Sequence, residues 1–132
     1  PVLFVEVLGH EACVDAASHS YVHYLLSVLR GGRLEVVARR YREFEELHRR
    51  LKAIPAASRP PRKDLPHLTG KKWALGLARE NVVDKRKRKL GEYLHEVYAL
   101  AGAYPAVAAL LNTFLSGVGE AAAAAVGMTT AQ

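Results

Sequence analysis

Arginine and tyrosine side chains gather in the segment Arg39-Arg40-Tyr41-Arg42, and residues of these types in this order are suited to binding an anion. The guanidinium group is planar and always charged, so it can donate two parallel hydrogen bonds to one phosphate or carboxylate group. The segment lies where an extended stretch, residues 34–38, gives way to a helical pattern. We expect this strand-to-helix corner to fix the backbone while leaving Arg39 and Arg40 free to converge on an anion.

The basic residues of the chain are concentrated at this corner and after it. Of the 19 Lys and Arg residues, 17 lie in residues 39–89 beside six acidic residues, which gives that part a net charge of +11. Residues 1–38 hold two basic and four acidic residues, and residues 90–132 hold three acidic residues and no Lys or Arg. Such an uneven distribution indicates a polyanionic partner, either lipid headgroups or nucleic acid.

Three stretches rich in β-branched and aromatic residues predict β-strands at residues 2–8, 21–29 and 34–38. Gly9 is expected to end the first strand, with residues 9–19 as the connection to the second. Gly31-Gly32 can adopt the positive φ values of a tight hairpin, so the second and third strands are expected to pair antiparallel. The result is a three-stranded antiparallel sheet that needs helices to cover it.

Apolar residues at helical spacing predict three helices after the sheet. Their buried faces are expected to hold, in order, Phe44, Leu47, His48 and Leu51; then Val83, Leu90, Leu94, Val97 and Ala101; then Val107, Leu110, Leu111, Phe114 and Leu115. The second helix is expected to begin at about Arg79, with Asn81 or Asp84 capping its better-formed part, and to end at Gly102. Pro105 suits the first turn of the third helix.

Four prolines separate the first two helices, namely Pro55, Pro60, Pro61 and Pro66. They predict an extended crossing that is partly polyproline II, and such segments also bind SH3 domains. Strands followed by helices make the fold class α+β.

Several function classes are disfavoured by what the sequence lacks. The six histidines have no metal-ligand spacing, and no phosphate-cradling glycine loop or nucleophile motif is present, so we expect neither an enzyme nor a bound metal or cofactor. Cys13 stands alone, which excludes an internal disulfide and suits a reducing compartment; its simplest role is a small apolar residue near a strand end. The chain starts at Pro1 without a signal-peptide pattern, and no apolar run approaches the roughly 20 residues of a membrane span.

Three blocks of sequence occur in an order that is familiar from one family. They are Arg39-Arg40-Tyr41-Arg42-Glu43-Phe44 with Leu47 and Leu51, then Leu65-Pro66-His67-Leu68-Thr69-Gly70-Lys71, then Arg86-Lys87-Arg88-Lys89-Leu90 with Tyr93 and Leu94. From about Val2 to Leu115 the chain resembles a phox-homology (PX) domain, the phosphoinositide-binding module of sorting nexins and related trafficking proteins. The resemblance implies a sheet packed against a helical subdomain of three to four helices with a proline-rich crossing. The domain is expected at residues 1–116, with 117–132 as a flexible Gly/Ala-rich tail or linker.

The resemblance implies a role for four residues. Arg40 corresponds to the arginine that binds the 3-phosphate of the inositol ring, and Tyr41 to the aromatic residue that packs against that ring. Lys71 corresponds to the lysine that approaches the 1-phosphate, and Arg86 to the arginine that hydrogen-bonds the 4- and 5-hydroxyls. Thr69 stands where the family often has a second proline, so Lys72 is an alternative for the 1-phosphate.

The segment after Lys71 is then expected to meet the bilayer. Lys72 would face anionic lipid, while Trp73, Leu75 and Leu77 would enter the boundary between headgroups and acyl chains, or else belong to the core. In the basic run Lys85–Lys89 only Arg86 is assigned a role, because such a run is by default a solvated helix turn.

The resemblance therefore implies a module that recognises phosphatidylinositol 3-phosphate and recruits its parent protein to endosomal membranes from the cytoplasm. One alternative is a protein-interaction scaffold that keeps the PX fold but binds lipid weakly. The other is a basic nucleic-acid-binding domain, which is disfavoured because the aromatic residues do not interleave with the basic run.

Overall fold

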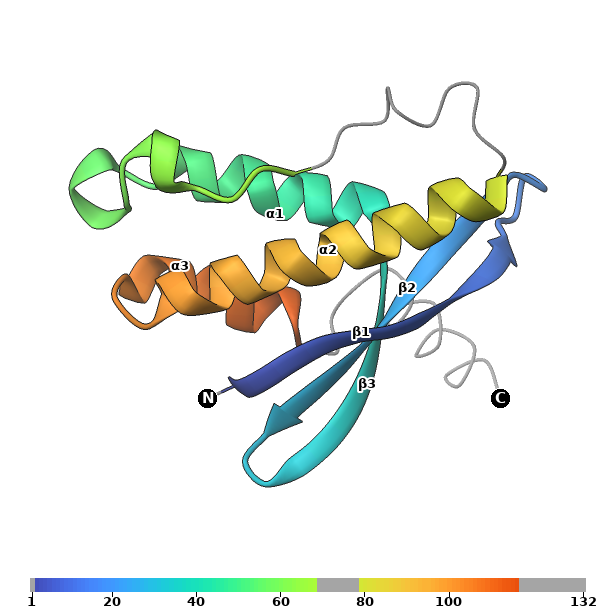
Figure 1. The fold of residues 1–132 in the computed structure, drawn as a ribbon, viewed down its shortest axis with the longest axis horizontal. Coiled ribbons are helices and arrows are strands. Elements are labelled where there is room, and N and C mark those ends of the chain that lie inside the picture. Colours follow the sequence, from blue (N-terminus) through green and yellow to red (C-terminus); the bar gives the residue numbers. More distant parts are fainter. Residues whose placement is uncertain (1, 69–78, 117–132) are drawn as a thin grey trace.

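A three-stranded antiparallel sheet forms the N-terminal part of the computed structural model, which describes residues 2–68 and 79–116. Its strands are β1 (Val2–Val14), β2 (Ser20–Arg30) and β3 (Arg33–Arg40), in the order β1-β2-β3 (Figure 1). Gly31 and Gly32 form the β2–β3 turn with φ values of 55° and 77°, which only glycine adopts readily. The predicted sheet, its pairing and its hairpin are confirmed.

The first strand is longer than predicted, and the expectation that Gly9 ends it is wrong. The strand continues through Gly9 to Val14, and its register against β2 shifts between Val7 and Gly9, so Leu8 is an extra, bulged residue. A glycine inside a strand often marks such a bulge. The connection between β1 and β2 is therefore short. An Asp15 carboxylate oxygen stabilises it by accepting hydrogen bonds from the backbone N–H groups of Ala17 (2.9 Å) and His19 (2.8 Å).

The helices are α1 (Tyr41–Ala53), α2 (Arg79–Ala101) and α3 (Pro105–Phe114), with two short 3-10 turns, η1 (Ala56–Ser58) and η2 (Arg62–Asp64), between α1 and α2. The predicted end of α2 at Gly102 and the predicted position of Pro105 in the first turn of α3 are confirmed. The predicted cap at Asn81 or Asp84 is wrong, because α2 is already helical from Arg79. Asp84 instead lies on the helix surface, 3.6 Å from the Lys87 ammonium group.

The proline-rich crossing has the expected conformation where the structure describes it. Pro55 and Pro61 have φ near −50° and ψ near 145°, the polyproline II region, and each precedes one of the 3-10 turns. The Arg59 side chain donates hydrogen bonds to the carbonyl groups of Ile54 (2.8 Å) and Pro60 (3.0 Å), which fastens the crossing to the end of α1.

The three helices lie together beside the twisted sheet and bury one of its faces (Figure 1). Alternation along β2 sends Tyr24, Leu26 and Val28 into this core, each no more than 1% exposed. Phe44 of α1 is fully buried and packs its ring edge-on against Phe114 of α3, with 4.9 Å between ring centroids, and against Tyr24. The core therefore joins the sheet to α1 and α3 at one aromatic cluster. None of the helices in the described ranges is long and apolar enough to cross a membrane.

Arg39 is part of this core, which corrects the expectation that it is free to meet an anion. Its side chain is 2% exposed, and its guanidinium donates hydrogen bonds to the backbone carbonyls of Ala38, Phe114 (2.8 Å from Nε) and Ser116. Glu43 lies 4.0 Å away. Burial lowers the pKa of Arg39, and the Glu43 carboxylate opposes that shift. The strand period of two sends neighbouring residues to opposite faces, so only Arg40 can turn away from the core.

Replacing Arg39 by Met tests this structural role. The Arg39→Met variant keeps the side-chain volume but leaves three carbonyl oxygens without their donor, one of them in a buried hydrogen bond, so we expect a loss of roughly 2–4 kcal/mol in the free energy of unfolding. Urea denaturation measures it. Arg33→Met, at an exposed position of the same strand, is the matched control and should change stability little. Equal losses in the two variants would show that Arg39 is not a structural anchor.

His48 of α1 lies half-buried against α2, with Nδ1 2.9 Å from the Tyr93 hydroxyl oxygen. Burial lowers the pKa of His48 from its ordinary value of 6.5, and the charges of Lys52 and His67 add to the effect. The unfolded chain therefore takes up this proton more readily, so the stability that neutral His48 provides is lost as the pH falls through 6.5.

We expect His48→Gln to flatten the fall in unfolding free energy between about pH 7.5 and about pH 5, measured by urea denaturation at several pH values. Tyr93→Phe is the control, since it removes the hydroxyl but keeps the burial, and it should retain the wild-type slope. An unchanged slope in His48→Gln would contradict the argument.

Candidate anion-binding site

Arg40 is held at the corner between β3 and α1 by its own backbone. It is the last residue of β3, pairs with His23 across the sheet, and is the N-cap of α1 with φ −82° and ψ 158°. Its backbone N–H donates a hydrogen bond of 2.9 Å to Glu43 Oε1 in the first turn of the helix. The N-terminus of α1, where helix N–H groups concentrate positive potential, lies directly beside it. The predicted fixed corner is confirmed for this residue.

The guanidinium of Arg40 lies over the ring of Tyr21, with Cζ 4.0 Å from the ring centroid. Tyr21 belongs to β2 and is two residues from His23, the partner of Arg40 in the sheet. A cation–π contact engages the face of the guanidinium, whereas phosphate oxygens bind at its edge, so the two interactions are compatible. Sequence reasoning missed Tyr21, because only the strand register places it beside Arg40.

A second arginine, Arg86 of α2, lies between two other tyrosines. Its Cζ is 4.2 Å from the ring centroid of Tyr41, and its side chain hydrogen-bonds the hydroxyl of Tyr24 on β2. Burial raises the pKa of both tyrosines, and the charge of Arg86 opposes the rise. The guanidinium is thus fixed by contacts from α1 and β2, although it is carried on a long side chain of α2.

The structure therefore places Arg86 against the ring of Tyr41, and it places Arg40, the residue before Tyr41, against the ring of Tyr21. Tyr41 is only 7% exposed, and Arg86 covers a face of its ring. The other predicted site residues lie outside the described residues. They are Lys71, the alternative Lys72, and the proposed membrane contacts Trp73, Leu75 and Leu77.

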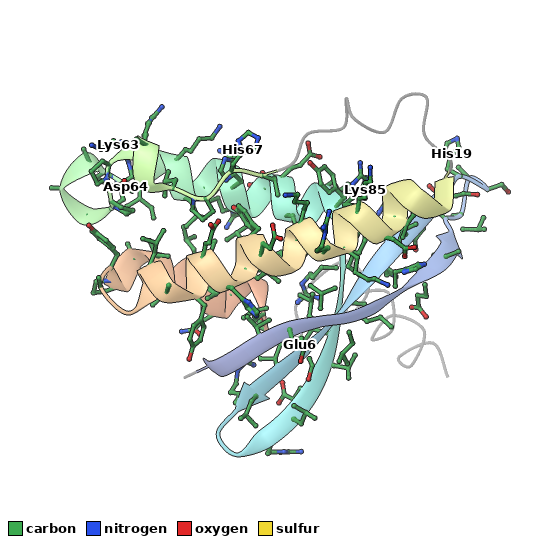
Figure 2. The ribbon with its side chains drawn as sticks, in the orientation of Figure 1. Glu6, His19, Lys63, Asp64, His67 and Lys85 are labelled. Carbon is green, nitrogen blue, oxygen red and sulfur yellow. The ribbon has the colours of Figure 1, made fainter. Side chains whose placement is uncertain are left out.

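The neighbours of Arg86 in the basic run are arranged differently. Lys87 and Lys89 lie 3.6 Å and 3.5 Å from the carboxylates of Asp84 and Glu92. Lys85 and Arg88 are exposed, and Figure 2 shows Lys85 on the surface of α2. Within the described part of the run, an aromatic contact is made by Arg86 and not by these neighbours.

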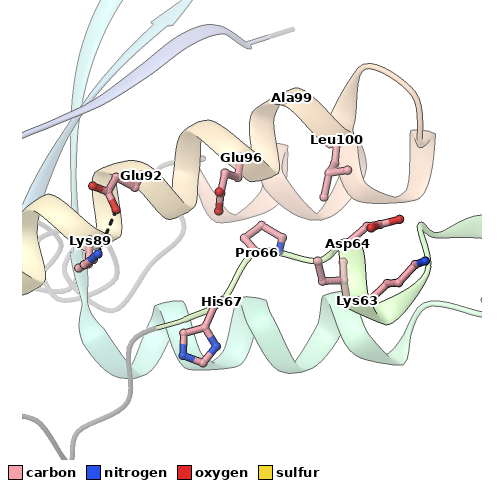
Figure 3. A pocket seen from close by; sticks show the side chains of 10 residues that line it. Lys63, Asp64, Pro66, His67, Lys89, Glu92, Glu96, Ala99 and Leu100 are labelled. Atoms are coloured by element: carbon pink, nitrogen blue, oxygen red, sulfur yellow. Dashed lines mark ion pairs between the residues drawn. The ribbon is translucent and has the colours of Figure 1, made fainter.

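A groove of about 760 Å³ lies between the proline-rich crossing and α2 (Figure 3). Its walls carry three carboxylates, those of Asp64, Glu92 and Glu96, while one of its two lysines, Lys89, is paired with Glu92. A phosphate group would meet net negative charge there. This groove is therefore poorly suited to an anion.

Comparison with known proteins identifies the family and the fold of the chain. Residues 28–116 match the family model described as PX domain. Among solved structures, a designed CISK-PX domain is 28% identical, with a TM-score of 0.65 over 86% of this chain and 99% of that one. The mouse SNX19 PX domain is 24% identical, with a TM-score of 0.56 over 87% and 97% of the two chains.

A structure of the mouse SNX19 PX domain with a bound sulphate ion is 25% identical, with a TM-score of 0.55 and the same coverage. The comparison with curated proteins gave no significant match. The family model thus covers about two thirds of the chain and includes the Arg40 corner and the basic run of α2.

Proposed function

Because this chain belongs to the PX domain family, whose members are generally non-enzymatic phosphoinositide-binding modules, we propose that it recognises phosphatidylinositol 3-phosphate. In this proposal the domain recruits its parent protein to endosomal membranes, where it lies peripherally on the cytoplasmic face. The observation that carries the proposal is the position of Arg40, fixed by β3 on one side and by the first turn of α1 on the other.

A fixed backbone at Arg40 reduces the conformational entropy that is lost when the side chain binds a phosphate. The guanidinium then offers two parallel donors to the 3-phosphate, and the N-terminus of α1 adds favourable potential. The SNX19 PX domain was solved with a sulphate ion, which is also a tetrahedral oxyanion. Lysine at position 40 would keep the charge but lose the planar fork.

Arg86 is proposed to read the opposite edge of the inositol ring. The contacts with Tyr41 and Tyr24 fix its guanidinium, so its donors can select the 4- and 5-hydroxyls and disfavour a phosphate at those positions. Lys71 or Lys72 would approach the 1-phosphate, and Trp73, Leu75 and Leu77 would enter the bilayer surface. Each basic residue near anionic lipid contributes on the order of 1 kcal/mol, so binding should weaken as salt is added.

Liposome co-sedimentation at near-physiological salt tests the role of Arg40. Wild type should prefer vesicles with phosphatidylinositol 3-phosphate over vesicles with only phosphatidylserine, and Arg40→Ala should weaken that binding by about tenfold or more, since it removes a charged bidentate contact. Arg88→Ala is the matched control, because it removes an exposed arginine from the basic region and should leave the preference intact. Equal binding to all anionic vesicles, indifferent to Arg40, would reduce the site to a basic surface.

The selectivity assigned to Arg86 is tested by a ratio of affinities. Wild type should bind the 3-phosphate lipid more tightly than the 3,4- and 3,5-bisphosphates, and Arg86→Gln should bring this ratio about tenfold closer to one. Lys85→Gln, an exposed neighbour, is the control. A general loss of folding lowers all affinities together and leaves the ratio unchanged, so an unchanged ratio would remove Arg86 from the specificity site.

A further inference from the structure

Three potential metal ligands meet at the end of the sheet nearest the β1–β2 turn. Glu11 and Cys13 are two residues apart on β1, and His23 of β2 lies directly opposite Glu11. The imidazole Nδ1 of His23 is 3.2 Å from Cys13 Sγ and 3.8 Å from Glu11 Oε1. The three donor atoms all lie within 4.8 Å of one another.

The two separations measured from His23 Nδ1 are close to those of a tetrahedral zinc site. Zinc bonds of about 2.3 Å to sulfur and about 2.0–2.1 Å to nitrogen or oxygen place neighbouring ligands roughly 3.3–3.6 Å apart. The two distances measured from His23 Nδ1, 3.2 Å and 3.8 Å, therefore lie within about 0.5 Å of these values. A thiolate, an imidazole and a carboxylate also form a donor set that zinc commonly binds.

Burial and access agree with a binding site. The imidazole of His23 is 8% exposed and packs against the edge of the Tyr21 ring, with 5.0 Å between centroids, so its orientation is fixed. Cys13 is half-buried, whereas the Glu11 side chain is 58% exposed to solvent. Both strands are tied by backbone hydrogen bonds, so little backbone conformational entropy remains to be lost when an ion binds.

We propose that Glu11, Cys13 and His23 bind a thiophilic divalent cation of the zinc type, with water in the fourth position. On binding, the Cys13 thiol gives its proton to solvent and the sulfur becomes the thiolate ligand. The sequence alone predicted no metal site, because Cys13 and His23 are ten residues apart and only the pairing of β1 with β2 brings them together. The proposal does not depend on lipid binding.

Cobalt titration of the reduced 132-residue chain tests the proposal directly. Co²⁺ should produce a thiolate-to-cobalt charge-transfer band in the near ultraviolet that saturates at one ion per chain and disappears when Zn²⁺ is added. Cys13→Ser should abolish the band, and Glu11→Gln, at an exposed position, should weaken Co²⁺ binding by about tenfold or more. His10→Gln, at an exposed position of the same strand outside the cluster, is the matched control and should bind as wild type does.

Thermal unfolding provides a second measurement. Zn²⁺ should raise the unfolding temperature of wild type, since an ion that binds only the folded state stabilises it, and this shift should be smaller in Glu11→Gln. A missing charge-transfer band, a band that persists in Cys13→Ser, or equal effects of Glu11→Gln and His10→Gln would overturn the proposal. Should Cys13→Ser fail to fold, the exposed Glu11→Gln and His10→Gln pair still decides between the two outcomes.

Discussion

The buried guanidinium of Arg39 is the constraint on which the rest of the arrangement depends. It donates hydrogen bonds to the carbonyls of Phe114 and Ser116, 75 and 77 residues away, and so fastens the end of β3 to the end of α3. The aromatic contact between Phe44 and Phe114 closes the same junction from the side of α1. The corner where β3 becomes α1 is therefore fixed by the core beneath it and not by the turn alone.

This constraint explains why adjacent arginines have different surroundings. With Arg39 committed to the core, the strand period turns Arg40 to the opposite face, where the Tyr21 ring supports it. Arg86 reaches the junction from α2 and is supported in the same way by Tyr41. A long, flexible side chain loses much entropy on binding, and stacking on an aromatic ring removes part of that loss in advance.

The sequence was sufficient for the features that depend on local pattern. Apolar spacing predicted all three helices, Gly31-Gly32 predicted the hairpin, and the corner at Arg40 followed from the change of period between β3 and α1. The features it missed depend on contacts between distant residues. Nothing local distinguishes the buried Arg39 from the surface Arg40, and nothing local places Tyr21 under Arg40 or His23 beside Cys13.

The bulge at Leu8 shows how one residue decides such contacts. Before the bulge Val5 pairs with Val28, and after it Glu11 pairs with His23. The pairing of β1 with β2 is thus shifted by one residue from Gly9 onward. Without the bulge His10 would oppose His23, and Glu11 and Cys13 would point to the other face of the sheet, because a slip of one residue exchanges the two faces. Gly9, at which the sequence pattern wrongly ended the strand, is thus part of the bulge that brings Glu11, Cys13 and His23 together. The proposed metal site and the proposed anion site therefore both adjoin the central strand β2, since His23 lies opposite Glu11 of β1 and opposite Arg40 of β3.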